Sequence, residues 1–356
     1  MSARFRPARS PMMPALAAML MAGAMVLPAV PAPAGSVSQS HSTAATVNAL
    51  ASELAAGFVF PETGARYAAA LKQKLAGGAY ASISDPEALA KALTSDLQAV
   101  APDGHLKVFS PAATAKAGPR GLAGPDAQGL IASGWLADGV AYANFNLFPG
   151  DPETVAKVDA FIAAHAGAKV LIIDVRGHRG GGLAEMDRLF PQMFTRETAL
   201  VTMDTRQAVE EQGDGPLREN ATLRRQASPV GVVRRTHYAV PAARPVWANT
   251  KIYLLTAKRT ASAAEHLALS LKRTGRATLV GEATRGANHF GGLAELPGGF
   301  GVFVPVGRTF DPETGRDWEG SGVAPDVTVP AAEALDKALA LAGVDPARVR
   351  SLPGAG

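Results

Sequence analysis

The chain has 356 residues, a formal net charge of +4, seven histidines and no cysteine. The lack of cysteine excludes disulfide bonds and a lipid-modified cysteine anchor, and no two histidines have the helical spacing of a zinc site. The length is enough for one large domain, or for one domain with a small companion.

Residues 1–34 predict an export signal. Arg4, Arg6 and Arg9 precede an apolar run from Ala15 to Leu27, and small residues at 32–34 offer a cleavage site. The run is too short to span a bilayer comfortably, so we expect a periplasmic or secreted protein without a membrane span after signal removal. Without the three arginines the net charge falls from +4 to about +1, which gives no support for a nucleic-acid partner.

Residues 35–110 predict a small helical subdomain, because apolar residues recur at helical spacing along three segments. These residues are Val47, Leu50, Leu54 and Phe58, then Tyr67, Leu71 and Leu75, and finally Leu89, Leu93 and Leu97. The sequence Ser84-Asp-Pro-Glu87 favours the start of the last helix, with proline in the first turn. Residues 111–129 are rich in alanine, glycine and proline and predict a linker.

Residues 130–345 predict an α/β core. Apolar strands are expected at 139–147, 169–174, 251–256 and 277–280. A helix is expected after the first of these strands and another after the third, and such alternation is typical of a parallel sheet.

The last part of the core predicts β-hairpins over residues 295–329, with a turn at 311–315, and then a helix that carries Leu335 and Leu339. Residues 346–356 form a tail. Within the core, a cluster of basic residues is interpreted as exposed loop or hairpin positions: Arg224, Arg225, Arg234 and Arg235.

Ser262 is a candidate nucleophile, because it lies where the strand 251–256 turns into a helix. The positive end of a helix and its free N–H groups stabilise the negative charge that develops during acyl transfer. The sequence Ser262-Ala-Ala-Glu265 is also the pattern of a capping box, in which serine only satisfies the first helical turn. Those four residues alone favour the capping box, so other segments of the chain must distinguish a nucleophile from a cap.

The segment 174–182, Asp-Val-Arg-Gly-His-Arg-Gly-Gly-Gly, directly follows an expected buried strand. Consecutive glycines let backbone N–H groups approach a ligand closely, as an oxyanion hole or anion nest requires. A flexible turn is the alternative. A phosphate loop is disfavoured because no Gly-Lys-Ser/Thr follows.

Two histidines are candidates for a general base, since histidine titrates near neutral pH. His105 follows the tight turn Asp103-Gly104, and His289 lies in the glycine-rich loop 286–292. Glu319, in a second tight loop, is a candidate to orient a histidine. A partly exposed turn histidine and a solvated loop glutamate are the simpler interpretations of these residues.

Five motifs occur in an order that resembles the C-terminal processing (tail-specific) serine protease family. They are Asp103-Gly-His-Leu106, Leu171-Ile-Ile-Asp-Val-Arg176 with the glycines after it, Thr260-Ala-Ser-Ala-Ala-Glu265, Gly275-Arg-Ala-Thr-Leu-Val-Gly-Glu-Ala-Thr284 and Trp318-Glu-Gly-Ser-Gly-Val-Ala-Pro-Asp326. The similarity extends from about Leu50 to Leu341. It is strongest to the branch with the tricorn core protease and the modules of interphotoreceptor retinoid-binding protein.

The resemblance implies a crotonase-like (ClpP/crotonase) α/β core after a helical N-terminal subdomain. Residue by residue, Ser262 matches the nucleophile, and the N–H groups of Ala263 and of Gly180 or Gly181 match the oxyanion hole. His105 and Glu319 match the histidine and glutamate of the tricorn-like branch, with His289 as an alternative base.

Two departures from the family pattern affect the expected mechanism. Members with a Ser–Lys dyad carry the lysine in Gly-Glu-x-Thr-x-Gly-Lys, where this chain has Ala287. A methyl group accepts no proton, so that dyad is excluded. Only about twenty residues separate Phe109 from the core, too few for a PDZ domain, and this weakens the case for a tail-specific substrate preference.

The leading hypothesis is an exported serine endopeptidase with a Ser–His–Glu site, a peptide or protein substrate and no cofactor or metal. The sequence leaves a homo-oligomer open. One alternative is a non-catalytic binding protein for apolar small molecules or peptides on the same scaffold, since fold does not fix function. Another is an acyl-transfer enzyme that acts on thioesters, which the motifs fit less well.

Overall fold

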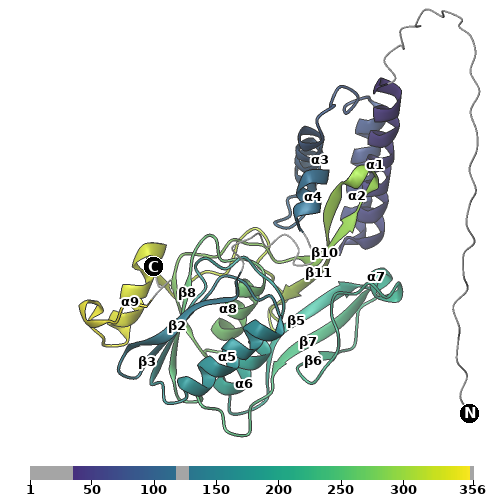
Figure 1. Ribbon diagram of the computed structural model, residues 1–356. Helices are drawn as coiled ribbons and strands as arrows, with labels where there is room; N and C mark the ends of the chain where they lie inside the picture. The colour runs from purple at the N-terminus through teal and green to yellow at the C-terminus, as the bar shows by residue number, and fades with distance from the viewer. Residues whose placement is uncertain (1–34, 118–127, 353–356) are drawn as a thin grey trace, which may run out of the picture.

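The computed structural model describes residues 35–117 and 128–352 of the chain (Figure 1). The expected signal 1–34, part of the expected linker and the last four residues of the tail lie outside the described residues. The helices are α1 (Gly35–Gly57), α2 (Pro61–Ala76), α3 (Pro86–Val100), α4 (Pro111–Ala117), α5 (Pro152–Ala164), α6 (Met186–Met193), α7 (Gln207–Glu211), α8 (Ala263–Arg273) and α9 (Ala334–Leu341).

In the described part of the chain, the strands form two six-stranded sheets. The first sheet has the order β1-β11-β5-β7-β6, with β10 also paired to β11, and its strands are antiparallel. The second has the order β12-β9-β8-β4-β3-β2 and is parallel except for the β2–β3 pair. The strands are β1 (Lys107–Phe109), β2 (Leu130–Ala137), β3 (Val140–Phe145), β4 (Val170–Asp174), β5 (Thr198–Arg206), β6 (Leu223–Arg225), β7 (Val232–Ala239), β8 (Lys251–Thr256), β9 (Thr278–Gly281), β10 (Phe290–Glu295), β11 (Gly301–Phe310) and β12 (Val327–Thr328).

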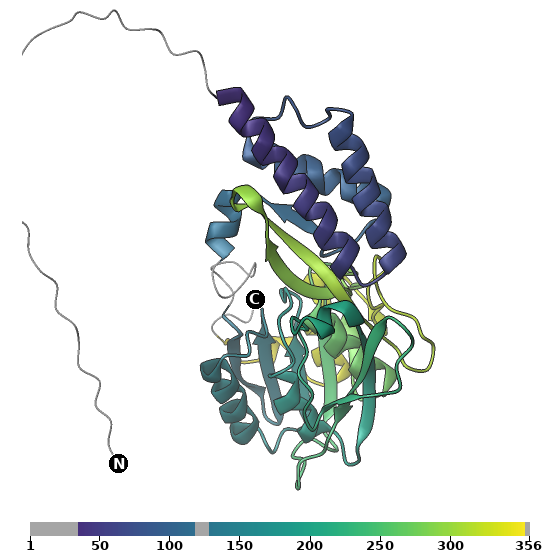
Figure 2. The same cartoon turned by 90° about the vertical axis from the view of Figure 1, so that its right-hand side faces the viewer.

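Helices α1–α3 stand beside the β10–β11 hairpin, away from the parallel sheet (Figures 1 and 2). The expected apolar positions of these helices form one cluster with Val302, Val304 and Val306 of β11, and all are buried except Leu75, which is partly buried. Helix α3 begins where the sequence predicted: Pro86 is its first residue, and the Asp85 carboxylate accepts from two N–H groups of the first turn. The helices thus cover one end of the antiparallel sheet.

The parallel sheet contains both expected strand–helix–strand units, β3–α5–β4 and β8–α8–β9. Helices α5, α6 and α8 bury a large apolar cluster against one face, and α9 covers the other face (Figure 1). Because β4 and β8 are parallel neighbours, the loops after them leave the same edge of the sheet. That edge therefore brings the glycine loop and Ser262 together.

Three details differ from the sequence predictions. The expected linker 111–129 begins with the short helix α4. In the region 295–329 the structure has one hairpin, β10–β11, and after the turn at 311–315 a long loop leads to the two-residue strand β12. Arg235, expected to be exposed, is 2% exposed and pairs with Glu210, because β7 is an inner strand of the antiparallel sheet.

Candidate active site

Ser262 immediately precedes helix α8 and has a strained backbone. Its φ of +56° is the only positive value of a non-glycine residue in the described part of the chain. An ordinary N-cap residue has an extended backbone, and a side chain with positive φ costs about 1–3 kcal/mol. Strain of this kind gathers at functional sites, where a rigid turn exposes a nucleophile. The positive φ thus distinguishes Ser262 from an ordinary N-cap residue, while the capping-box pattern with Glu265 is also present.

Glu265 fixes the start of this helix. Its buried carboxylate accepts from the N–H of Ser262 at 2.8 Å, from the Thr284 hydroxyl at 2.6 Å, and from the N–H groups of Gly286 and Ala287 at 2.7 and 2.9 Å. Burial raises the pKa of Glu265, and these four hydrogen bonds oppose the rise. The glutamate thus joins Ser262 to the loop 284–287.

The glycine loop after β4 packs directly on Ser262. Gly180 and Gly181 have φ of +122° and +123°. A Cβ added at Gly180 would lie 2.9 Å from Ser262 Cβ, and one at Gly181 would lie 2.1 Å from the carbonyl oxygen of Phe148. Both close approaches require glycine.

The two candidate oxyanion donors in this loop are not equivalent. The Gly180 N–H donates to His178 Nδ1 at 3.1 Å, and burial lowers the pKa of His178 to about 3, so that ring stays neutral and accepts. No acceptor among the described residues bonds to the N–H of Gly181 or of Ala263. Of the candidates, Gly181 and Ala263 are therefore the pair available to bind an oxyanion.

A cleft of about 610 Å³ contains Ser262, Gly181 and His105 in its wall. The cleft also has an aromatic side formed by Phe109, Phe148, Phe290 and Phe303. His289, the alternative base, is not among the described residues that line it. Of the two candidate bases, His105 lines the cleft that Ser262 also lines.

His105 is held in an apolar environment. Its ring stacks on Phe303 at 5.4 Å, and its Nδ1 is buried without a hydrogen-bond partner among the described residues. Burial lowers the pKa of His105 to about 4; the Asp103 carboxylate opposes this, while His289 and Arg285 add to it. The ring is therefore neutral near pH 7 and able to accept a proton.

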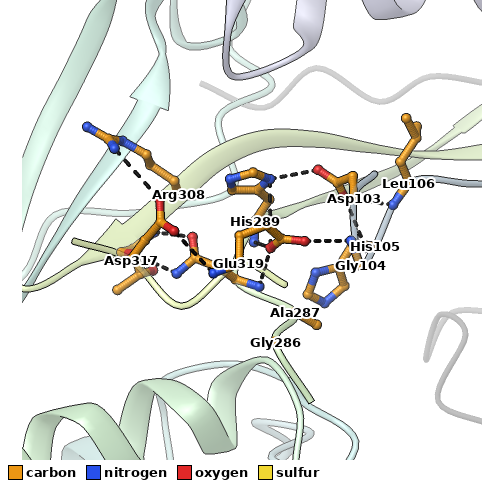
Figure 3. Close-up of polar contacts among 12 residues, drawn as sticks. Asp103, Gly104, His105, Leu106, Gly286, Ala287, His289, Arg308, Asp317 and Glu319 are labelled. Atoms are coloured by element: carbon orange, nitrogen blue, oxygen red, sulfur yellow. Dashed lines mark hydrogen bonds and ion pairs between the residues drawn. The ribbon is translucent and has the colours of Figure 1, made fainter. Parts of the chain in front are cut away.

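Glu319 contacts the backbone of the His105 turn, and among the described residues its carboxylate bonds to backbone N–H groups and not to the His105 ring (Figure 3). Its Oε1 accepts from the Gly104 N–H at 2.6 Å, and its Oε2 accepts from the N–H groups of Asn288 and His289 at 2.6 and 3.2 Å. The glutamate can therefore position His105 through the turn that carries it.

Asp103 is a site residue that sequence reasoning treated only as part of a turn. It is buried, and its Oδ1 accepts from the N–H groups of His105 and Leu106 at 2.9 Å each. Its Oδ2 contacts His289 Nδ1 at 2.6 Å. Burial raises the pKa of Asp103, but these bonds outweigh it and hold the pKa below its usual value. The Asp-Gly-His pattern was the only local signal.

The side chains of Asp103, His289 and Glu319 lie close enough to share a metal ion. Both carboxylates accept backbone N–H groups and His289 Nδ1 bonds to Asp103, whereas His289 Nε2 is buried without a hydrogen-bond partner among the described residues. A cation would have to replace these bonds. The group is better described as a hydrogen-bonded cluster.

Ala287 stands where the motif of Ser–Lys proteases has its lysine, and it lines the same cleft as Ser262 and His105. It is 2% exposed. A Cβ added at Gly104 would lie 3.0 Å from Ala287 Cα and 3.1 Å from Glu319 Oε1. The turn before His105 thus lies against this alanine, which places a histidine-bearing segment beside the position of the missing lysine.

Comparison with known families settles the relationship suggested by the motifs. Residues 139–329 match the model of peptidase family S41. The chain belongs to this family. Residues 36–127 match the N-terminal domain of S41 peptidases in eukaryotic interphotoreceptor retinoid-binding protein. The predicted resemblance is therefore confirmed, and peptidase is the enzyme class that goes with the S41 family.

One curated relative of this S41 chain is a carboxyl-terminal-processing protease from Picosynechococcus sp., 39% identical over 82 residues. The match covers 23% of this chain and 20% of the relative. The chain therefore spans only a fifth of that protein's length.

Solved structures share the mixed α/β fold. The photosystem II D1 C-terminal processing protease has a TM-score of 0.51 and 17% identity, over 88% of this chain and 100% of that one. A protein described as a peptidase from Parabacteroides merdae has a TM-score of 0.54 and 17% identity, over 83% and 92% of the two chains. A lipoprotein from Streptococcus agalactiae has a TM-score of 0.53 and 14% identity, over 89% and 98%.

No helix within residues 35–117 and 128–352 has both the length and the apolar character needed to cross a bilayer.

Proposed function

We propose that this S41 chain is an exported serine endopeptidase that hydrolyses peptide bonds through an acyl-enzyme. Ser262 is the nucleophile, His105 is the base, and Glu319 positions the histidine in place of a Ser–Lys dyad. The observation that carries the proposal is the shared cleft, which is lined both by a strained serine at a helix N-terminus and by a half-buried histidine whose pKa is lowered.

The first chemical step transfers the Ser262 Oγ proton to His105. The neutral ring accepts it through Nε2, because Nδ1 is buried, while Oγ forms the bond to the scissile carbonyl carbon. The carbonyl oxygen gains the negative charge. The free N–H groups of Gly181 and Ala263 are the donors proposed to bind it.

The second step breaks the bond to the leaving amine, which receives the proton from His105. Water then enters the cleft, gives a proton to His105 and attacks the acyl-enzyme, and Ser262 regains its proton on release. Glu319 keeps the ring in place through Gly104 at 2.6 Å. Its role is therefore positional in both steps.

The proposal includes an architecture and a location. The core is proposed to be crotonase-like, over residues 130–345, with a helical subdomain over 35–110, a connecting segment and no PDZ domain. The N-terminal 34 residues are proposed to direct export to the periplasm or outside the cell. The substrate is a peptide or protein, no cofactor is required, and a homo-oligomer is compatible with these assignments.

Labelling with a fluorophosphonate probe tests the activated serine without knowledge of the substrate. The mature protein should react, and Ser262→Ala should lose the label. Ser270→Ala is the matched control, because Ser270 lies in the same helix but is fully buried, and it should label as the parent does. Equal labelling of the Ser262→Ala variant would overturn the nucleophile assignment.

A second function, binding of an apolar ligand, is supported by one observation. Four phenylalanine side chains line the cleft, and such walls suit an apolar small molecule as well as a peptide side chain. If the folded protein does not react with the probe but binds a fluorescent long-chain fatty acid in competition with retinol, the binding-protein hypothesis replaces the peptidase.

A further inference from the structure

His289 is a buried histidine beside two carboxylates (Figure 3). Its Nδ1 lies 2.6 Å from Asp103 Oδ2 and 3.8 Å from Glu319 Oε2. The rings of Phe58 and Phe60 meet it in T-shaped contacts at 6.3 and 5.4 Å. The neighbouring carboxylates favour a cation.

The same two carboxylates hold three consecutive N–H groups of the turn that carries the base. Asp103 Oδ1 accepts from His105 and Leu106, and Glu319 Oε1 accepts from Gly104. Glu319 also accepts from the N–H of His289 itself. The N–H groups of residues 104–106 are therefore all held by carboxylates that lie beside His289.

We propose that His289, in its protonated form, is a positioning residue that holds Asp103 and Glu319 together and so keeps His105 in place for proton transfer. Loss of its proton leaves the buried carboxylate of Asp103 and the partly buried carboxylate of Glu319 with no cation between them, and their repulsion loosens the turn. This inference rests on the proposed function and adds regulation by alkaline pH to the same site.

The electrostatics of the cluster agree with this geometry. Burial lowers the pKa of His289, but the hydrogen bond and charge of Asp103, with the charges of Glu319 and Asp317, outweigh burial and raise the pKa above its usual value. The His289 charge in turn lowers the pKa of His105, which keeps the base neutral. The ionisable groups around the cluster are Asp103, Glu319, Asp317, His105, Arg308 and Tyr67.

The rate of fluorophosphonate labelling of Ser262, followed against pH, tests this role. In the parent the rate should fall on the alkaline side as His289 loses its proton. His289→Gln keeps a hydrogen-bond donor but carries no charge, and it should label about 100-fold more slowly near pH 7, since a misplacement of about 1 Å costs that much. It should also lose the alkaline fall.

A matched control separates positioning from stability. His165 is a buried histidine with one ring hydrogen bond, to Phe161, and it does not line the cleft. His165→Gln should leave both the rate and the pH profile as in the parent, even where its melting temperature falls. A His289→Gln variant that labels at the parent rate, or that keeps the alkaline fall, would overturn the proposal.

The charge of His289 can be measured without any activity. Nitrogen-15 NMR spectra of mature Ser262→Ala should show the His289 ring as an imidazolium near pH 7. The His289 signal is assigned by its loss in the double variant that also carries His289→Gln. A neutral ring would refute the proposal. Exchange of the Gly104 amide should quicken as this ring titrates. If the parent protein does not react with the fluorophosphonate probe, the peptidase assignment fails. The ring spectra and the Gly104 amide exchange then still test the role of His289.

Discussion

Glu319 accepts a hydrogen bond of 2.6 Å from the N–H of Gly104, a residue 215 positions earlier in the chain. The same carboxylate accepts from Asn288 and His289, while Glu265 accepts from Ala287 and Ser262. One loop, residues 284–289, therefore joins the helix that begins after Ser262 to the turn that carries His105. The relative position of Ser262 and His105 depends on this loop.

Replacement of Glu319 by glutamine should lower kcat without unfolding the protein. An amide has one acceptor oxygen, so either Gly104 N–H or the Asn288 and His289 N–H groups would face an amide NH₂ group instead. We expect a loss of about 10- to 100-fold in kcat, with KM little changed. The measurement is steady-state cleavage of a peptide selected from a library, beside the melting temperature.

Glu53→Gln is the control for this change, because Glu53 is exposed on helix α1, and it should leave kcat as in the parent. Full activity of Glu319→Gln would refute the positional role of the glutamate.

Three glycines of the loop after β4 should respond differently to alanine. Gly180→Ala drives a methyl group to 2.9 Å from Ser262 Cβ, and Gly181→Ala places one 2.1 Å from Phe148 O, both at positive φ. Gly181 is the proposed oxyanion donor, and loss of one such donor costs about 100- to 1000-fold in kcat, so we expect a fall of that size for Gly181→Ala. Gly180→Ala should also lower kcat, because its methyl group would displace Ser262. Gly182→Ala is the control, because its added Cβ meets only Phe148 O at 3.9 Å, and it should keep most of the rate of fluorophosphonate labelling. If this variant loses as much activity as Gly180→Ala and Gly181→Ala, the loop tolerates no side chain at any of the three positions.

The local parts of this fold could be predicted from sequence. Helices α3 and α5 each begin with a proline that follows an aspartate cap. Both strand–helix–strand units contain continuous apolar strands. Ser262 was found because a strand, a serine and a helix are neighbours in the chain. Each of these signals lies within about ten consecutive residues, so it can be recognised without knowledge of long-range contacts.

The long-range pairings could not be predicted. The sequence predicts an exposed Arg235, because no local pattern indicates its ion pair with Glu210 on the separate helix α7. Likewise, the His289–Asp103 contact joins residues 186 positions apart, and neither local pattern contains the other. For this reason the sequence offered two candidate bases, whereas the structure assigns one to the cleft and the other to the support behind it.

The acid side of the pH profile should lie below that of an ordinary histidine. His105 must be neutral to accept a proton, and burial lowers its pKa to about 4, so activity should persist as pH falls and be lost only near that value. The lowered pKa also means that the unfolded chain binds this proton more readily. Stability should therefore decline as pH falls from the usual histidine value toward about 4.

Arg285 offers a directional test of this assignment. Its charge lowers the pKa of His105, so Arg285→Gln should move the acid limb of the labelling profile to higher pH. Arg316→Gln, on an exposed turn, should leave the limb in place. An acid limb that does not move with Arg285→Gln, or one that moves down, would show that His105 is not the titrating base.

Removal of the Glu265 carboxylate should destabilise the protein as well as inactivate it. Glu265→Ala leaves the N–H groups of Ser262, Gly286 and Ala287 and the Thr284 hydroxyl without their acceptor in a buried position. Since each unsatisfied buried group costs about 1–3 kcal/mol, we expect a loss of at least about 3 kcal/mol in the free energy of unfolding, measured by urea denaturation. Glu282→Ala, at a partly exposed neighbouring position, should change it by about 0.5 kcal/mol or less. If Glu265→Ala unfolds at the same urea concentration as the parent, the glutamate does not anchor the loop that joins the nucleophile to the base.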